Sequence, residues 1–207
     1  MVFSLDLEGV LAPEIWPVLG ATFNVPEFSF TTRDIVDFEE LMRQRVAGAT
    51  RAGLRLADLQ NVAHSIEPFL GAREFLGKLR SLGNVIIISD TFHEFSEPLA
   101  TKLGGVSLFA NRFELDATGR ITGFKLRIRG QKERIVSGFK GAGYKVAAMG
   151  DSMNDLSLLK SCDFPVIYRP SEMLAAEFPG VTAVHNLDDA LLLLEAAARR
   201  RAAERDA

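Results

Sequence analysis

Cysteine and histidine are scarce in this chain of 207 residues, which has a single cysteine, Cys162, and three histidines. One cysteine excludes an internal disulfide and a zinc site built on several thiolates. The histidines, at positions 64, 93 and 185, have no paired spacing that would favour a histidine metal site. The absence of disulfides favours a reducing compartment, so the expected location is the cytoplasm.

The chain also lacks a surplus of positive charge and a long apolar run. Its 24 Lys and Arg residues stand against 27 Asp and Glu residues, so a net charge of −3 offers no basic field for nucleic acid or anionic lipid. The longest uncharged stretch, 15–26, has 12 residues, whereas a membrane-spanning helix needs about 20. The amino terminus has no basic start and contains acids, so we expect no signal peptide and a mature protein that begins at residue 1.

What the chain does contain is an alternation of strand and helix patterns. Its length and its 47% hydrophobic content suit one large domain, or one domain with a smaller insertion. Amphipathic helices are expected between short apolar runs, one ending at Gly83 and another carrying Val136 and Phe139. Five such runs are typical of buried strands: 2–7, 84–89, 145–149 and, more weakly, 165–168 and 182–185. This alternation predicts a parallel sheet covered on both faces.

The first break in this alternation is the segment 13–71, which contains no run typical of a buried strand. Thr31 or Thr32 could cap a helix that continues to Val46, and a second helix is expected over 56–66. We therefore predict a small helical insertion after the first strand.

Two further elements are expected later in the chain. Period-two alternation on both sides of the turn 116–119 predicts an antiparallel hairpin over 113–126 at the edge of the sheet. A last helix is expected from Asp188, as its capping acid, to Ala207, with exposed arginines near its end.

Acidic and hydroxyl residues follow three of the predicted strands: Asp6 and Glu8, then Ser89 and Asp90, then the segment 150–155. The carboxyl ends of parallel strands open onto one crevice, so these side chains should converge. Each group alone is also typical of a turn or helix cap, and Ser152 to Asp155 has the spacing of a capping box.

Clustered carboxylates repel one another unless a cation lies between them. Mg²⁺ prefers a few hard oxygen ligands and keeps several waters. Asp6, a carbonyl of the turn after it and Asp151 would therefore suffice as protein ligands, beside a phosphate oxygen. The sequence thus indicates a magnesium site that also binds phosphate.

Two cationic residues occupy apolar helix faces, where a charged side chain is unusual. At 100° per residue, Lys132 lies on the same face as Val136 and Phe139. Arg45 lies within the apolar stripe of the inserted helix, whereas Arg33 and Arg43 point away from it. We expect Lys132 and Arg45 to face an anionic ligand, although the stem of Lys132 could also extend to the surface. Glu14, which follows Pro13, is either a partner for a ligand cation or an exposed turn residue.

These residues in this order resemble the haloacid dehalogenase superfamily of phosphotransferases. The resemblance rests on four elements: Asp6 with Glu8, Ser89 after an apolar strand, Lys132, and Gly150-Asp151-Ser152-x-Asn154-Asp155. Within the superfamily, the chain is similar to phosphoserine phosphatases. Glu8 replaces their usual Asp, and Asp90-Thr91 replaces their Gly-Gly. Both differences match the bifunctional branch that combines phosphoserine phosphatase with homoserine phosphotransferase, and the likeness extends to about Asn186.

The resemblance implies an α/β fold, a doubly wound, mostly parallel Rossmann-like sheet, with residues 1–12 and 72–207 as the core and 13–71 as a helical cap. It implies a Mg²⁺-dependent enzyme that acts on phosphoserine through a phosphoaspartate, with homoserine as a second acceptor. The resemblance implies Asp6 as nucleophile, Glu8 as general acid and base, and Asp6, Asp151 and the backbone of Glu8 as metal ligands. Ser89, Lys132 and Asn154 would bind the phosphoryl oxygens, and Glu14 and Arg45 the substrate ammonium and carboxylate. Asp90 is expected among the substrate-binding residues and Asp155 as a supporting residue.

Four other kinds of protein fit parts of this pattern. A receiver-type signalling domain also gathers acids, a hydroxyl and a lysine around an aspartate, but its acid pair precedes the phosphorylated residue on another strand. A dinucleotide-binding enzyme is disfavoured because Gly141-Ala-Gly143 precedes a strand and lacks the third glycine. A non-catalytic phosphate-binding protein and a phosphatase of another small phosphomonoester remain alternatives, and the oligomeric state is left open.

Overall fold

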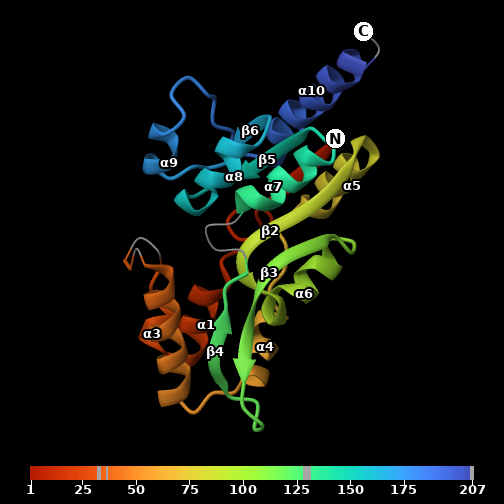
Figure 1. The fold of residues 1–207 in the computed structure, drawn as a ribbon. Helices are drawn as coiled ribbons and strands as arrows, with labels where there is room; N and C mark the ends of the chain where they lie inside the picture. The colour runs from red at the N-terminus through yellow and green to blue at the C-terminus, as the bar shows by residue number, and fades with distance from the viewer. Residues whose placement is uncertain (32–33, 36, 128–131, 206–207) are drawn as a thin grey trace.

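The predicted sheet is present and is the centre of the fold (Figure 1). A computed structural model describes residues 1–31, 34–35, 37–127 and 132–205, and for 201–205 the backbone alone. The strands are ordered β4-β3-β2-β1-β5-β6, and all neighbours are parallel except β3 and β4. Their bounds are β1 Val2–Leu5, β2 Asn84–Phe92, β3 Ser107–Leu115, β4 Ile121–Lys125, β5 Val146–Gly150 and β6 Phe164–Ile167. The α/β prediction is confirmed.

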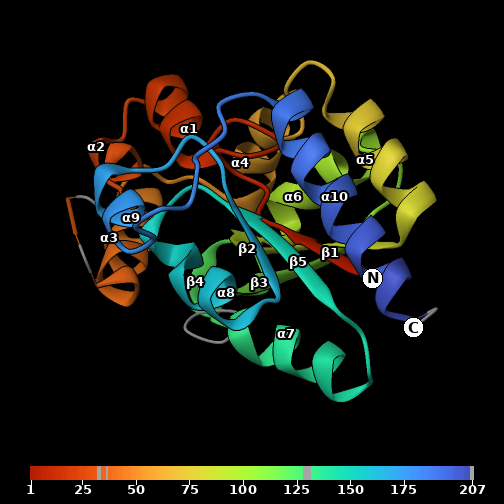
Figure 2. The same cartoon turned by 90° about the horizontal axis from the view of Figure 1, so that it is seen from above.

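Helices cover both faces of this sheet (Figure 2). Alternate strand residues divide between two apolar clusters, with Phe3 and Leu5 in one and Val2 in the other. A strand segment buried on both faces is apolar at nearly every position, as residues 85–88 of β2 show. The helices that follow β1 outside the insertion are α5 Ala72–Leu82, α6 His93–Lys102, α7 Lys132–Gly141, η1 Met153–Asp155, α8 Leu156–Ser161, α9 Glu172–Ala176 and α10 Leu187–Arg205.

The insertion after β1 is helical, as predicted, but contains two helices that the sequence did not reveal. Its helices are α1 Ile15–Phe23, α2 Pro26–Ser29, α3 Phe38–Arg51 and α4 Leu56–Ala63. The first two were missed because α1 carries Pro17 and α2 has only four residues. Proline is tolerated in the first turn of a helix, where the backbone N–H has no intrahelical partner.

The start of α3 differs from the prediction. Asp37, and not Thr31, caps this helix by accepting a hydrogen bond from the backbone N–H of Glu39 at 2.9 Å. Thr31 instead belongs to a turn in which its N–H donates to Asp34 at 2.8 Å. The predicted cap at Thr32 and the orientation of Arg33 lie outside the described residues.

The hairpin β3–β4 is confirmed, and Asp116 closes its turn by accepting from the backbone N–H groups of Thr118 and Arg120 at 2.8 and 3.0 Å. The hairpin is more than an edge addition, because the first half of β3 pairs with β2 in parallel. The sequence missed this half because its continuous apolar run, 108–110, has only three residues. The N–H of Leu56 donates to the carbonyl of Gly119 at 3.0 Å, so the helical insertion also contacts this hairpin.

Two predictions near the carboxyl end were wrong. Residues 182–185 do not form a strand, since only Val184 pairs, in an isolated bridge with Tyr168. Asn186 takes the expected capping role of Asp188, because its Oδ1 accepts from the N–H of Asp189 at 2.8 Å. Among the described residues, no helix is both long and apolar enough to cross a membrane.

Candidate active site

The polar residues that follow β1, β2 and β5 converge at one pocket, as their strand positions predicted. These three strands are neighbours in the sheet, so their carboxyl ends lie side by side. The pocket encloses about 160 Å³ and is lined by Asp6, Glu8, Glu14, Trp16, Thr31, Phe38, Leu41, Arg45, Ser89, Asp90, Thr91, Asp151, Ser152 and Asn154. Eight of the ten residues expected at the site line this pocket. The other two, Lys132 and Asp155, lie behind the lining residues.

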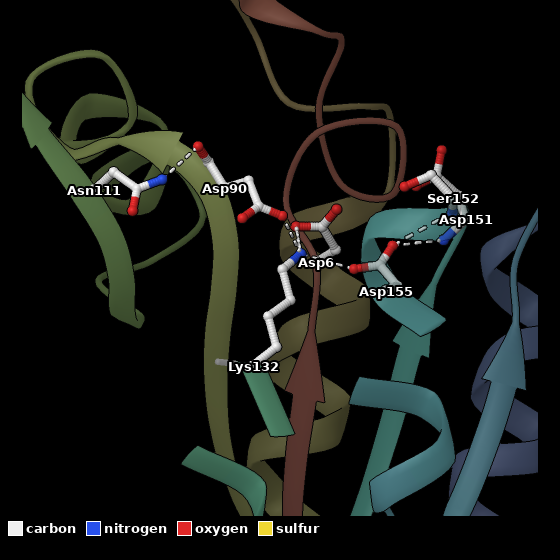
Figure 3. A network of polar contacts seen from close by, with 7 residues as sticks. All are labelled: Asp6, Asp90, Asn111, Lys132, Asp151, Ser152 and Asp155. Carbon is white, nitrogen blue, oxygen red and sulfur yellow. Dashed lines mark hydrogen bonds and ion pairs between the residues drawn. The ribbon is translucent and has the colours of Figure 1, made fainter. Parts of the chain in front are cut away.

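Lys132 contacts three carboxylates at the base of the pocket (Figure 3). Its Nζ lies 2.8 Å from Asp155 Oδ1, 3.1 Å from Asp90 Oδ2 and 3.5 Å from Asp6 Oδ1. The side chain is only 2% exposed, so the expected inward orientation is confirmed. The neighbouring carboxylates raise the pKa of Lys132, which keeps it charged. A phosphoryl group in the pocket would therefore lie near the positive charge of Lys132 as well as near Asp6 and Asp90.

Asp155 satisfies both interpretations of its motif, as a helix cap and as a site residue. Its Oδ1 binds Lys132, while its Oδ2 accepts from the backbone N–H groups of Asp151 and Ser152 at 3.1 and 3.4 Å. It forms the predicted capping box with Ser152 and is completely buried. Asp155 thus links the charge of Lys132 to the loop that carries Asp151.

Gly9 allows the turn after β1 to approach that loop. Its backbone φ of +78° lies in a region that residues with a Cβ rarely adopt. A Cβ at this position would lie about 2.4 Å from Asp151 Oδ2, a distance shorter than any contact allows. The glycine therefore lets the Asp6–Glu8 turn and Asp151 share one site.

The chemistry of this site fits a divalent cation. Carboxylate oxygens of Asp6, Asp151 and Asp155 lie within 4.8 Å of one another. Burial and the charge of Asp155 raise the pKa of Asp6 well above its usual value, and the same causes raise the pKa of Asp151 to about 7. Raised carboxyl pKa values mean that negative charge is undercompensated here. Since Asp155 is already bonded to Lys132 and to two N–H groups, Asp6 and Asp151 are the better candidates for metal ligands.

Glu8 occupies the junction between the sheet and the helical insertion. Its Oε2 accepts from the backbone N–H of Ile15 at 2.9 Å, so Glu8 caps α1 across seven residues. Thr91 also donates to this carboxyl. Burial raises the pKa of Glu8, and the hydrogen bonds from Thr91 and Ile15 together with the charge of Arg45 oppose that shift. A carboxyl held in this way can donate and accept a proton at the pocket.

Arg45 lies at the side of the pocket formed by the insertion and is only 5% exposed. Its Nη2 donates to the carbonyl of Phe30 at 2.7 Å, and its guanidinium stacks 4.6 Å from the ring centre of Trp16. Burial lowers its pKa to about 10, so it remains charged at neutral pH. Its Nε has no hydrogen-bond partner among the described residues. By contrast, Arg43 is exposed and pairs with Glu39 and Glu40, as the helical rotation predicted.

Two further wall residues were not predicted to have a role. Trp16 packs edge-on against Phe28, Phe95 and Phe113, which fixes the ring beneath Arg45. Thr91 hydrogen-bonds to Glu8. Thr91 stands in a segment that carries the family resemblance, and Trp16 is the single tryptophan of the chain, which was a signal in the sequence. The Thr91 contact has no local signal because its partner lies 83 positions earlier.

Comparisons with known proteins agree with this geometry. Residues 10–160 match the haloacid dehalogenase-like hydrolase family. Phosphoserine phosphatase ThrH of Pseudomonas aeruginosa is 40% identical over 188 residues, which cover 91% of this chain and 92% of the relative. A phosphoserine phosphatase of Pseudomonas syringae pv. tomato is also 40% identical, over 91% of this chain and 79% of its own.

Solved structures show the same fold at lower identity. A substrate-bound phosphoserine phosphatase complex has a TM-score of 0.74 at 19% identity, covering 92% of this chain and 96% of its own. A phosphoserine phosphatase from T. onnurineus has a TM-score of 0.71 at 22% identity, covering 93% of both chains.

Proposed function

The chain belongs to the haloacid dehalogenase-like hydrolase family, and from that premise we propose that it hydrolyses phosphoserine through a phosphoaspartate at Asp6. One observation carries the choice of substrate. The pocket has the carboxylate cluster and Lys132 at its base and the charged Arg45 and Glu14 on its walls. A phosphomonoester that also carries an ammonium and a carboxylate fits both regions: its phosphoryl group would bind at the base of the pocket, and its ammonium and carboxylate would bind Glu14 and Arg45.

The chain's own residues account for the chemistry. The carboxylate of Asp6 attacks phosphorus, the bond from phosphorus to the serine oxygen breaks, and Glu8 gives its proton to that oxygen. Glu8 then takes a proton from the acceptor that opens the phosphoaspartate. Lys132 lowers the repulsion between Asp6 and the phosphoryl group, while Ser89 and Asn154 position its oxygens. Mg²⁺, held by Asp6, Asp151 and the Glu8 carbonyl, would neutralise further phosphoryl charge when bound.

We assign residues 13–71 as a cap over a core of residues 1–12 and 72–207. The assignment is supported by the origin of the pocket residues: Glu14, Trp16 and Arg45 come from the insertion, whereas the other acids lie at or just after the carboxyl ends of strands β1, β2 and β5. Glu8, bonded to Ile15, is where the two parts meet.

The proposed acceptor is homoserine as well as water. Homoserine and the leaving serine are both amino-acid alcohols, so Glu14 and Arg45 can hold either one while Glu8 moves the hydroxyl proton. Homoserine added to a phosphoserine assay should give O-phosphohomoserine and lower phosphate release, both followed by ³¹P NMR. Unchanged phosphate release with no new phosphoester signal would leave a phosphatase only. No turnover of phosphoserine, with turnover of another phosphomonoester, would overturn the substrate assignment.

Arg45→Ala should impair phosphoserine turnover far more than turnover of p-nitrophenyl phosphate. Only phosphoserine has a carboxylate to leave unpaired, at a cost of about 2–4 kcal/mol. The expected loss in kcat/KM is therefore roughly 30- to 1000-fold for phosphoserine. Phosphoethanolamine, which keeps the ammonium and lacks the carboxylate, should behave like p-nitrophenyl phosphate. Arg43→Ala is the matched control on the same helix and should change neither value; equal losses on all substrates would make Arg45 structural.

A further inference from the structure

The strand β2 leaves its pairing with β3 at the pocket. Ile88 pairs with Phe109, and Phe92 pairs with Asn111. Between these two pairs β2 advances by four residues and β3 by only two. Residues 89–91 therefore form a bulge, and all three line the pocket. A bulge exposes functional side chains, but it also removes backbone groups from the ladder that would bond them.

The side chain of Asn111 replaces part of that lost pairing. Asn111 lies in β3, is completely buried and does not line the pocket. Its Nδ2 donates to the backbone carbonyl of Asp90 at 2.8 Å (Figure 3). The bulged residue is thus anchored through its backbone while its carboxylate lies 3.1 Å from Lys132 Nζ.

The other end of the same amide contacts the approach to α7. Asn111 Oδ1 accepts from the backbone N–H of Arg127 at 2.8 Å. Arg127 is the last described residue before Lys132, the first residue of α7. One amide group, with a donor at one end and an acceptor at the other, therefore joins the bulge of β2 to Arg127, five residues before Lys132.

We propose that Asn111 is a positioning residue that, through the bulge of β2, sets where Asp90 lies relative to Lys132 and Asp6; the proposal rests on the function given above. Asn111 reaches none of the reacting atoms itself. Its loss would release the bulge of β2 from Arg127, and a shift of about 1 Å in a catalytic group can cost about 100-fold in rate. Because Arg45 and Glu14 belong to the helical insertion and not to the bulge of β2, substrate binding should change little.

The test compares Asn111→Leu, which removes both hydrogen bonds at similar size, with the milder Asn111→Ser, which keeps a donor. For Asn111→Leu we expect kcat to fall by roughly tenfold or more and KM to stay within about threefold. The fall should be equal for phosphoserine and p-nitrophenyl phosphate, because the phosphoryl end is shared. The kcat of Asn111→Ser should lie between those of Asn111→Leu and wild type. If Asn111→Leu does not fold, the kcat of Asn111→Ser tests the proposal instead.

Ser96→Ala is the matched control. Ser96 is completely buried, and its Oγ donates to the carbonyl of Phe92 at 2.7 Å, so it also serves a backbone oxygen at the end of β2. This variant should lose stability and keep kcat within roughly a factor of two, because it touches no member of the charged cluster. Equal kcat losses in the Ser96 and Asn111 variants, or a loss confined to KM for phosphoserine, would overturn the proposal.

Amide exchange separates this inference from the proposed function. If wild type turns over neither substrate, the proposed function fails, and the Arg127 amide followed by NMR still tests Asn111. Its exchange should accelerate in Asn111→Leu and stay unchanged in Ser96→Ala. Unchanged protection of Arg127 in Asn111→Leu would show that Asn111 does not hold this segment.

Discussion

Asp6→Asn should abolish turnover while leaving the protein folded and as stable as wild type or more so. The amide cannot form the acyl phosphate, so kcat should fall by roughly 10⁴-fold or more. Stability should not fall, because burial and the charge of Asp155 raise the pKa of Asp6 and disfavour its ionised form. A neutral amide of the same shape relieves that repulsion in the metal-free protein. The measurement is kcat together with the thermal midpoint, Tm.

Asp163→Asn is the control for this experiment. Asp163 lies outside the pocket, accepts from the N–H of Val146 at 2.9 Å and pairs with Lys145 at 3.2 Å. These contacts lower its pKa, so its charge stabilises the fold, and the variant should lose stability but keep its activity. Activity of Asp6→Asn within about tenfold of wild type would exclude the covalent mechanism.

Lys132→Met should lower both turnover and stability. Removing the ammonium leaves Asp6, Asp90 and Asp155 without their shared cation, and breaking a buried ion pair in this way costs about 3–5 kcal/mol. Turnover should fall by at least roughly 10²-fold, because Asp6 would then approach the phosphoryl group without that charge. The measurements are urea unfolding and kcat, and added Mg²⁺ should restore part of the stability by binding the carboxylates.

The stability of Lys132→Met should also depend on pH, with a definite sign. Asp151 has a folded pKa of about 7 against an ordinary value of 3.8, and the pKa of Asp6 is raised as well. Between about pH 4 and pH 7 the folded protein thus holds protons that the unfolded chain has lost. Stability should be greatest below this window and fall as the pH rises through it, more steeply than in wild type, because the variant lacks the cation that stabilises the ionised carboxylates.

Lys140→Met serves as the control on the same helix. Its Nζ lies 3.7 Å from Asp163 on the surface, so the variant should lose at most about 1 kcal/mol and show no steeper pH dependence. Equal stability losses in the two variants would mean that Lys132 does not compensate the buried carboxylates.

Local patterns in the sequence were enough to predict much of this protein. Continuous apolar runs identified the central strands, because a strand covered on both faces is apolar at each position. Helical rotation predicted that Lys132 and Arg45 turn inward and that Arg43 does not. Parallel strands then placed Asp6, Ser89 and Asp151 at one edge of the sheet, since their carboxyl ends must open onto the same crevice.

The sequence predicted less where a structure depends on distant partners or on weak local patterns. It missed α1 and α2, the parallel half of β3, and the cap of α3 at Asp37. Short helices and mixed edge strands carry too little periodicity to be distinguished from loops. The motif of Asp155 illustrates the limit: the spacing to Ser152 suggested a cap, and only the packed structure added the bond to Lys132.

By itself, then, the sequence determined the α/β sheet, the inserted helices α3 and α4 and the residue types that gather at the pocket, because these follow from periodicity and strand polarity. Only the tertiary structure decided how those residues are held. Asn111 bonds to residues 21 and 16 positions away, Lys132 to Asp6 across 126, and Glu8 caps a helix that the sequence did not predict. Such contacts depend on where a bulge, a glycine turn and a helix start come to lie after packing, and no local pattern of side chains encodes that placement.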